Sequence, residues 1–194
     1  MVGTLTVQNL QGPASGANAN KVIIPSGHVL DVSGGTLVPS AGAVVGIAQS
    51  RSSAGTSVST TGTWIAVSGT NVSIATKQAG SSFIYHATMS AEADATSPHN
   101  CFFRYKYRIN GGSWVYHSSS LTTNATAVLD SQGSFNENLH YVFDGISYTA
   151  GNTIEFMVEF QTSVSGVYFN QPNLSGQPSG TSNFHQISVM EIAQ

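Results

Sequence analysis

Short runs of alternating apolar and polar residues, separated by Gly, Pro, Asn and Ser, recur along almost the whole chain. Alternation with a period of two is typical of strands that bury one face, and the separating residues are those that turns prefer. No segment keeps the helical i, i+3, i+4, i+7 spacing of apolar residues over two turns without interruption by Gly, Ser or a β-branched residue. The sequence therefore predicts an all-β protein.

Charged residues are rare in this chain. They make up 8% of the residues, against about 25% in an average soluble domain, so Ser, Thr, Asn, Gln and Gly must supply most of the polar surface. The 9% of aromatic residues and the many Val, Ile and Thr distinguish the chain from disordered sequences. Burying a neutral surface against a neighbouring molecule carries little cost of charge desolvation. The composition therefore favours a component of an assembly.

The charge balance and the first residues argue against two kinds of partner. The formal net charge is −3, whereas proteins that hold nucleic acid or anionic membranes need basic surface. No apolar stretch approaches the length of a membrane-spanning helix, and the N-terminus lacks the basic start and apolar run of a secretion signal. We therefore expect a protein made in the cytoplasm that neither holds nucleic acid nor inserts into a membrane.

The first 46 residues differ from the rest of the chain. Their apolar runs are short and are separated by turn-forming stretches at residues 12–13, 25–27 and 33–35. Strands this short cannot bury their own apolar side chains and need other chains to cover them. We therefore predict an extended N-terminal stalk or anchoring arm over residues 1–46. Its expected assembly contacts are Leu5, Val7, Val22, Ile24, Val29, Leu30 and Leu37.

From residue 47 onward the alternating runs lengthen and can form an antiparallel β-sandwich. The sequence Asn110-Gly111-Gly112 indicates a tight hairpin between two strands, because these residues tolerate positive φ. The number and spacing of the strands favour a jelly roll or a close relative over residues 47–194. The predicted strands cover residues 46–50, 63–67, 72–75, 82–93, 101–110, 113–117, 126–130, 139–144, 153–162, 166–169 and 185–192.

Alternation within two long strands assigns their side chains to two faces. One face of each strand is apolar and should point into the core. Its expected members are Phe103, Tyr105, Tyr107 and Ile109 in the first strand and Ile154, Phe156, Val158 and Phe160 in the second. The opposite faces carry charge, with three cations in the first strand and Glu155 and Glu159 in the second.

Arg104, Lys106 and Arg108 are half of the six cations in the chain and lie on one strand face. One interpretation is a surface that contacts a small anion or an acidic glycan. The interpretation that the sequence favours is a solvated or intersubunit face on which Glu155 and Glu159, or Glu92 and Asp94, lie opposite and form cross-strand ion pairs.

The residue patterns for catalysis and metal binding are missing. The six histidines, at positions 28, 86, 99, 117, 140 and 185, have no spacing typical of metal ligands. Cys101, the only cysteine, is expected to be a small buried hydrophobe. The chain has no G-x-S-x-G motif, no Cys beside His and no glycine-rich phosphate loop. We therefore expect a protein that is not an enzyme and that uses no cofactor or metal.

Three long polar segments, residues 118–124, 131–138 and 163–181, are expected to be loops. The last contains Tyr168 and Phe169, and aromatic rings beside Asn and Ser amides can hold a sugar or a protein surface. The alternative is that these segments are subunit contacts or solvated loops.

Several pieces of the sequence resemble fibre-like virion proteins of tailed phages, those of marine and cyanobacterial phages especially. Residues 5–13, 21–32 and 35–37 resemble stalk segments of such proteins. Residues 186–192 resemble the last strand of the knob that follows the stalk, and residues 64–73 are similar to an early strand pair of that knob.

The resemblance implies a homotrimeric structural protein of a phage particle. Its N-terminal arm would anchor it to tail or capsid proteins, and its jelly-roll knob would present a surface to a host glycan or protein. A tail-attachment domain is not recognisable, and the chain is short for a tail fibre. The alternative is therefore a capsid decoration or cement protein that clamps neighbouring capsid subunits. A carbohydrate-binding module without a virion role is a third interpretation, against which the arm argues.

Overall fold

The computed structural model describes Ser26 and residues 39–58, 62–93, 101–117, 133–163, 166–169 and 185–194. The chain divides into two compact units, Met1–Val38 and Pro39–Gln194. The arm contacts predicted from the sequence, Leu5 to Leu37, all lie outside the described residues. The arm therefore stays a prediction, and the second unit is described below.

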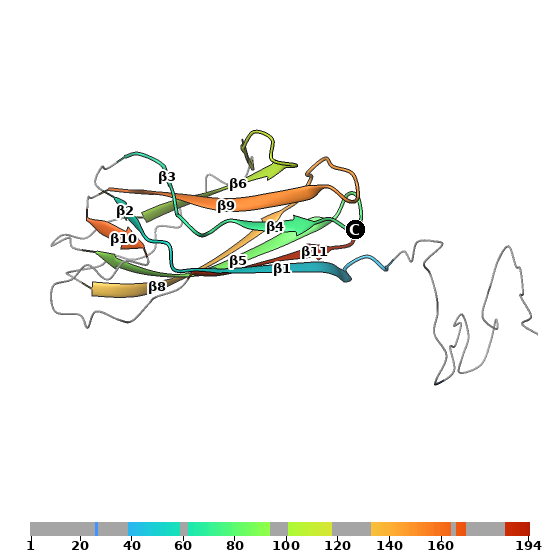
Figure 1. Cartoon of the computed structure of the whole chain (residues 1–194), viewed down its shortest axis with the longest axis horizontal. Helices are drawn as coiled ribbons and strands as arrows, with labels where there is room; N and C mark the ends of the chain where they lie inside the picture. The colour runs from blue at the N-terminus through green and yellow to red at the C-terminus, as the bar shows by residue number, and fades with distance from the viewer. Residues whose placement is uncertain are drawn as a thin grey trace, which may run out of the picture. The chain divides into compact units, whose positions relative to one another are not determined.

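Two antiparallel sheets form the second unit (Figure 1). Sheet A consists of β1 (Val44–Ser52), β2 (Thr56–Val58), β5 (Ser82–Ala93), β8 (Gly133–Phe143), β10 (Val167–Phe169) and β11 (His185–Ile192). Sheet B consists of β3 (Ile65–Ala66), β4 (Val72–Ala75), β6 (Cys101–Ile109), β7 (Val115–Tyr116) and β9 (Thr153–Thr162).

The strand order is that of a jelly roll. Sheet A runs β1-β11-β5-β8 and sheet B runs β4-β9-β6-β7, with the short strands β2, β3 and β10 added at one end. Successive main strands cross repeatedly from one sheet to the other, and the first strand of the unit lies beside the last. Eight main strands in this arrangement make the two-sheet jelly roll. The prediction of an all-β sandwich of this type is confirmed.

Strand bounds agree best where alternation is strong. β4, β5, β9 and β11 have the predicted bounds, whereas β2 was not predicted. β8 begins at Gly133, six residues before its predicted start, because it pairs with β5 along its whole length. Part of the segment expected to be a loop at 131–138 is therefore a strand. The strand predicted at 126–130 lies outside the described residues.

The sandwich begins earlier than the expected boundary at residue 46. The backbone N–H of Gly42 donates to the carbonyl oxygen of Ala193 (2.8 Å), and the N–H of Ala193 donates to the carbonyl oxygen of Ala43 (2.9 Å). Val44 then pairs with Ile192. Residues 39–46 therefore belong to the compact unit rather than to the arm, because they extend the edge of sheet A.

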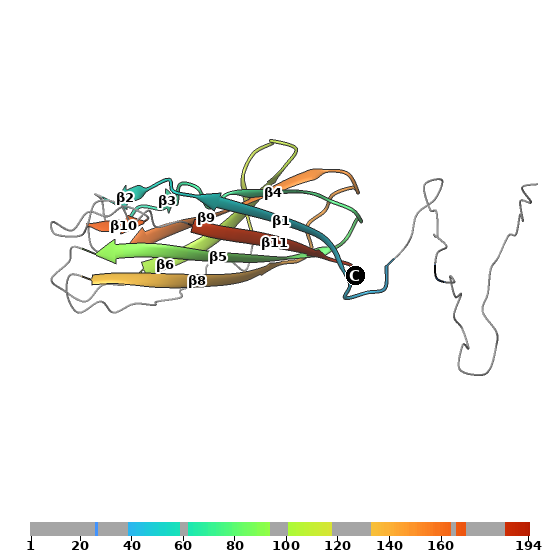
Figure 2. The ribbon, with the colours of Figure 1, turned by 60° about the horizontal axis from the view of Figure 1, so that its bottom comes forward.

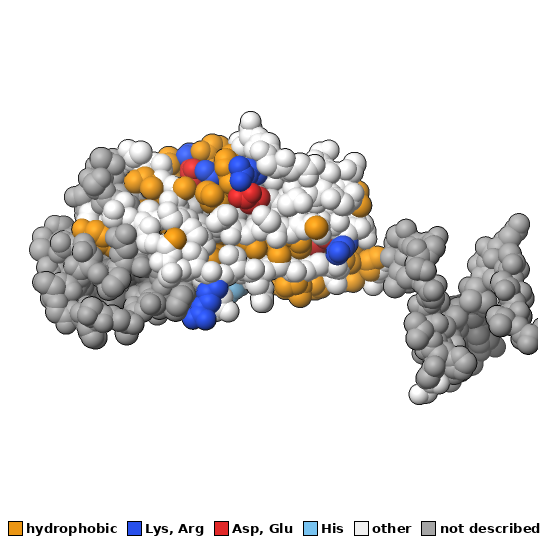
Figure 3. All heavy atoms as spheres, viewed as in Figure 1, with side chains coloured by type: hydrophobic (Ala, Val, Ile, Leu, Met, Phe, Trp, Pro, Cys, Tyr) orange, Lys and Arg blue, Asp and Glu red, His pale blue; other side chains and the backbone are white. Residues whose placement is uncertain are grey.

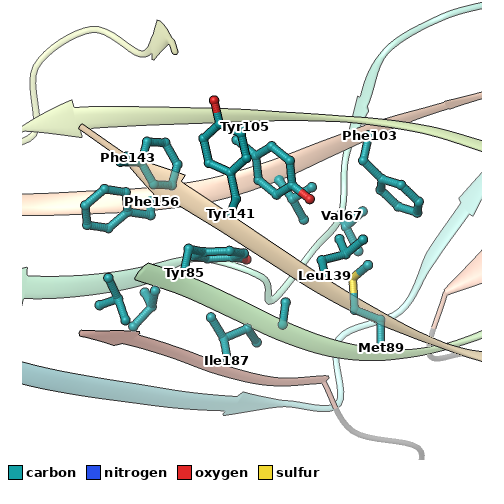
Figure 4. Packing of buried hydrophobic residues seen from close by; sticks show 14 of the residues in the cluster. Val67, Tyr85, Met89, Phe103, Tyr105, Leu139, Tyr141, Phe143, Phe156 and Ile187 are labelled. Atoms are coloured by element: carbon teal, nitrogen blue, oxygen red, sulfur yellow. The ribbon is translucent and has the colours of Figure 1, made fainter. Parts of the chain in front are cut away.

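Large aromatic side chains fill the space between the sheets (Figure 4). Tyr105 of sheet B stacks on Tyr141 of sheet A, with ring centroids 4.1 Å apart, and Phe143 packs against Phe156 at 4.6 Å. The hydroxyl of the fully buried Tyr85 donates to the carbonyl oxygen of Thr70 (2.7 Å). Each such side chain stabilises the fold by about 1.5–3 kcal/mol.

The core confirms the predicted faces of β6 and β9. Phe103 and Tyr105 are buried, and Tyr107 and Ile109 pack against the core. The four apolar residues predicted to point inward from β9, Ile154 to Phe160, are fully buried. The charged residues of both strands therefore lie on the outer face of sheet B.

Candidate binding face on sheet B

The register between β6 and β9 brings the cations of β6 against the carboxylates of β9. Arg104 lies opposite Glu159, and Arg108 lies opposite Glu155. Arg104 Nε donates to Glu159 Oε2 (2.6 Å), and Lys106 Nζ donates to Glu159 Oε1. Arg108 donates to Glu155 Oε2 through Nε (3.0 Å) and Nη2 (2.7 Å).

Cross-strand pairing, which the sequence favoured for these cations, is thereby confirmed. Of the two acid pairs considered, Glu155 and Glu159 are the partners. Glu92 lies in β5 of sheet A, and Asp94 lies outside the described residues.

Three aromatic rings cover these ion pairs, which the sequence did not lead us to expect. The guanidinium carbon of Arg104 lies 4.5 Å from the ring centroid of Trp64 and 4.0 Å from that of Tyr116. Trp114 lies over both Lys106 Nζ (5.0 Å) and the guanidinium carbon of Arg108 (4.6 Å). Such cation–π contacts add to the ion pairs. We call these eight residues, Trp64, Arg104, Lys106, Arg108, Trp114, Tyr116, Glu155 and Glu159, the aromatic–cation cluster.

The centre of the aromatic–cation cluster is shielded from water. Lys106 and Glu159 are only 7% and 6% exposed. Burial alone would raise the pKa of Glu159, but hydrogen bonds from Lys106 and Arg104 and their positive charges more than offset this, so its pKa lies below the ordinary value of 4.5. Glu159 is therefore a carboxylate at neutral pH.

The Tyr116 hydroxyl joins this network. It accepts a hydrogen bond from Arg104 Nη2 (2.8 Å) and lies 3.3 Å from Glu159 Oε2, to which it donates. The ring itself is exposed. Tyr116 therefore offers a flat apolar surface whose orientation is fixed by its polar end.

Three cations and two carboxylates leave the aromatic–cation cluster with a net charge of +1 (3 − 2). Figure 3 shows its blue and red side chains gathered with hydrophobic ones over β6 and β9. Because the charges are already paired, the surface suits a neutral or weakly acidic ligand better than a strong anion. Partly exposed Trp and Tyr rings beside hydrogen-bonding groups are typical of surfaces that bind polar ligands with an apolar side, such as sugars.

The interpretation of Phe169 as a surface-binding residue is wrong. Phe169 is fully buried and packs on Phe160 with ring centroids 4.4 Å apart. It lies in β10, whose alternation turns Val167 and Phe169 into the core. Tyr168 points the other way and is half-buried.

Among the described residues, no group of three or more His, Cys, Asp or Glu side chains could hold a metal ion. His117 lies with Nδ1 2.7 Å from the Tyr141 hydroxyl and Nε2 2.9 Å from the Asp144 carbonyl oxygen. The side chain of Cys101, and the whole of His28 and His99, lie outside the described residues.

The aromatic members of the cluster had a signal in the sequence. Trp64 and Trp114 are the only two tryptophans, and alternation in residues 113–117 places Trp114 and Tyr116 on one face. Alternation alone does not place this face beside the cations. The register of β7 against β6 does so, because Lys106 lies opposite Tyr116.

No protein-family model matches the chain, and a search of curated proteins finds no significant match. In the part of the chain that the structure describes, no helix is long and apolar enough to span a membrane.

Proposed function

We propose that this chain is a structural protein of a tailed-phage particle, of the trimeric fibre type. The arm predicted over the N-terminal residues anchors it to other virion proteins, and the jelly roll is a knob that contacts the host surface. In this proposal the outer face of sheet B binds a host glycan through the aromatic–cation cluster.

One observation carries the binding part of this proposal. Trp64, Trp114 and Tyr116 lie on the solvent side of sheet B, although the core between the sheets is built from aromatic residues and would be the usual place for tryptophan. A fold does not require large rings over a charged strand face. Ion pairs and cation–π contacts hold these rings in fixed positions, which lowers the entropy lost when a ligand stacks on them.

A glycan array probed with the labelled full-length chain tests this. We expect wild-type protein to bind one class of neutral or weakly acidic glycan. Trp114→Ala and Tyr116→Ala should each weaken binding at least tenfold, which corresponds to about 1.4 kcal/mol.

Gln186→Ala is the matched control, because Gln186 is exposed on sheet A and its substitution should leave glycan binding unchanged. Unfolding of each variant by urea shows whether it is folded. If folded variants that lack the rings bind as wild type does, sheet B is not the receptor surface. If no glycan binds, a host-protein receptor is the next possibility to test with whole cells.

Capsid decoration is the second candidate. A neutral surface with exposed Val44, Ile47 and Val142 on sheet A is also suited to lie on capsid subunits. Gold-labelled antibody against the chain on purified particles separates the two: label at the tail supports a fibre, and label over the capsid with a copy number matching the capsid lattice supports decoration. Absence of the chain from particles would contradict both.

A further inference from the structure

The outer face of sheet A carries a continuous band of apolar side chains. Ile47, Met190, Ile84 and Val142 are Cα partners in successive strands, so they form one row across β1, β11, β5 and β8. Figure 2 shows these four strands side by side. Val44 and Ile192 lie opposite each other two residues nearer the C-terminal end of β11. We call these six residues the apolar band.

Alternation shows that the apolar band faces away from the core. Phe83 and Tyr85 are fully buried, so Ile84 between them lies on the opposite face of β5, and Met190 lies likewise between the buried Val189 and Glu191. Ile47 is 61% exposed and Val142 is 54% exposed. With strands about 4.8 Å apart, the row is about 14 Å wide. These side chains therefore contribute nothing to the jelly-roll core and lie on its surface.

Exposed apolar side chains are concentrated on this outer face of sheet A. Among the described residues, five large hydrophobic side chains are exposed, and three of them, Val44, Ile47 and Val142, belong to the apolar band. A contiguous apolar patch on a sheet face marks an interaction site more often than scattered single residues do.

We propose that the apolar band is the surface through which copies of this chain contact each other. The next row of the same face, Gln49, Ser188, His86 and His140, contains no carboxylate, Lys or Arg. A second copy presents the same residues, so contact between copies through these two rows brings no like charges together. A strongly charged partner finds no complementary group on these two rows.

The composition of the face fits this occupant. A stable interface buries about 800 Å² on each partner, with an apolar centre and a polar rim. The apolar band supplies the centre, and the row from Gln49 to His140 supplies one side of the rim. The two remaining exposed hydrophobic residues, Val115 and Tyr116, lie on sheet B and extend no such band.

The apolar band includes the first strand of the second unit. β1 begins at Val44, six residues after the first unit ends at Val38. This inference rests on the trimer of the proposed function, but it locates the contact on described residues of the jelly roll.

Sedimentation velocity of the full-length chain over a range of micromolar concentrations tests the inference. We expect wild type to assemble and Ile47→Asp and Val142→Asp each to raise the dissociation constant at least tenfold. Val115→Asp is the matched control, because Val115 is 47% exposed and lies on sheet B. It should assemble as wild type does. All three positions are exposed, so the variants should keep the wild-type circular dichroism spectrum.

Hydroxyl-radical footprinting of wild-type protein gives a second readout that needs no variant. Met190 lies in the apolar band, and Met157 lies on the outer face of sheet B; both are half-buried in the single chain. We expect oxidation of Met190 to fall severalfold between dilute and concentrated samples, while oxidation of Met157 stays constant.

The outcomes separate the two proposals. If wild type forms trimers while both aspartate variants assemble equally well and Met190 remains reactive, the interface proposed here is wrong and the trimer stands. If wild type is monomeric at all concentrations, both the interface and the trimer are wrong. A monomer in which Met190 is already protected would likewise contradict the interface, because the band would then be covered within a single chain.

Discussion

Glu159 is the residue that joins the parts of the aromatic–cation cluster. It accepts hydrogen bonds from Arg104, Lys106 and Tyr116, and it is almost completely buried. Three groups from β6 and β7 therefore depend on one carboxylate of β9. Removing its charge leaves Lys106, which is equally buried, without its ion-pair partner.

We predict that Glu159→Gln destabilises the protein by about 3 kcal/mol at pH 7, since removing one partner of a buried ion pair leaves an uncompensated charge. Urea unfolding measures this loss of stability.

The pKa of Glu159 is lowered in the folded state, so the stability that its carboxylate contributes is present above the unfolded pKa of 4.5. This stability is lost as the pH falls through the lower folded pKa. The difference between wild type and variant should therefore shrink as the pH falls below 4.5. An equal difference at all pH values would contradict this.

His185 provides a second test at the scale of one residue. It is fully buried, and neither ring nitrogen has a partner at hydrogen-bond geometry within the described residues. Burial lowers the pKa of His185. A polar interaction of the ring with the Ala54 backbone favours the protonated form and offsets this effect in part. Because the folded pKa lies below the ordinary 6.5, stability is lost as the pH falls from 6.5 through the folded value.

We predict that His185→Leu is at least as stable as wild type at pH 7 and loses less stability between pH 7 and pH 5. Urea unfolding at the two pH values checks this. His86, whose pKa is also lowered by burial and by His140, should keep part of the pH dependence in the variant. A variant with the full wild-type pH dependence would show that His185 does not titrate in this range.

At the scale of elements, the sequence was informative where a strand has one apolar face. The bounds of β5 and β9 could be predicted, and in β9 the alternation also indicated which side chains point into the core. β2 has three residues and no alternation to detect, and the first half of β8 is polar enough to look like a loop. These two strands exist because β10 and β5 supply backbone partners, which a local pattern does not contain.

One part of the candidate site could be predicted from the sequence, and another part could not. Pairing of Arg104, Lys106 and Arg108 with β9 could be predicted, because both strands alternate and carry opposite charges. The contribution of Trp64 could not, because it depends on β3 lying beside β9, where Ile65 pairs with Phe160. Phe169 was misassigned although a strand was predicted over residues 166–169, because so short a strand does not show which of its faces is buried.

The hairpin between β6 and β7 gives a prediction for one element. Asn110 and Gly111 both have positive φ (50° and 71°), and the N–H of Gly112 donates to the carbonyl oxygen of Ile109 (2.9 Å). This confirms the tight turn expected from Asn-Gly. We predict that Gly111→Ala destabilises the protein by about 1 kcal/mol, since open space surrounds the new methyl group and only its backbone conformation is unfavourable.

Thermal unfolding measures this effect, with Gly111→Asn as the control. Asparagine adopts the left-handed conformation more readily than alanine, so the control should destabilise the protein less than Gly111→Ala does. If the two substitutions had equal effects, the left-handed conformation of residue 111 would not be what constrains the turn. The same hairpin positions Trp114 and Tyr116, so Gly111→Ala should also weaken any glycan binding slightly.

For the whole molecule, the scarcity of charge leads to a prediction about assembly. Only 15 of the 194 residues are Lys, Arg, Asp or Glu, and the paired ones on sheet B are already neutralised within the chain. Contact between copies through the apolar band would therefore depend on apolar burial, which ordinary salt concentrations change little, rather than on ion pairs, which salt screens.

We predict that the dissociation constant of the full-length assembly changes less than about threefold between 50 mM and 500 mM NaCl, a range over which the Debye length falls from about 14 Å to about 4 Å. Sedimentation velocity in both buffers measures it. The protein should instead dissociate on cooling, because the hydrophobic driving force weakens at low temperature. Strong weakening by salt would mean that charged groups hold the copies together, and the interface would then have to lie away from the apolar band.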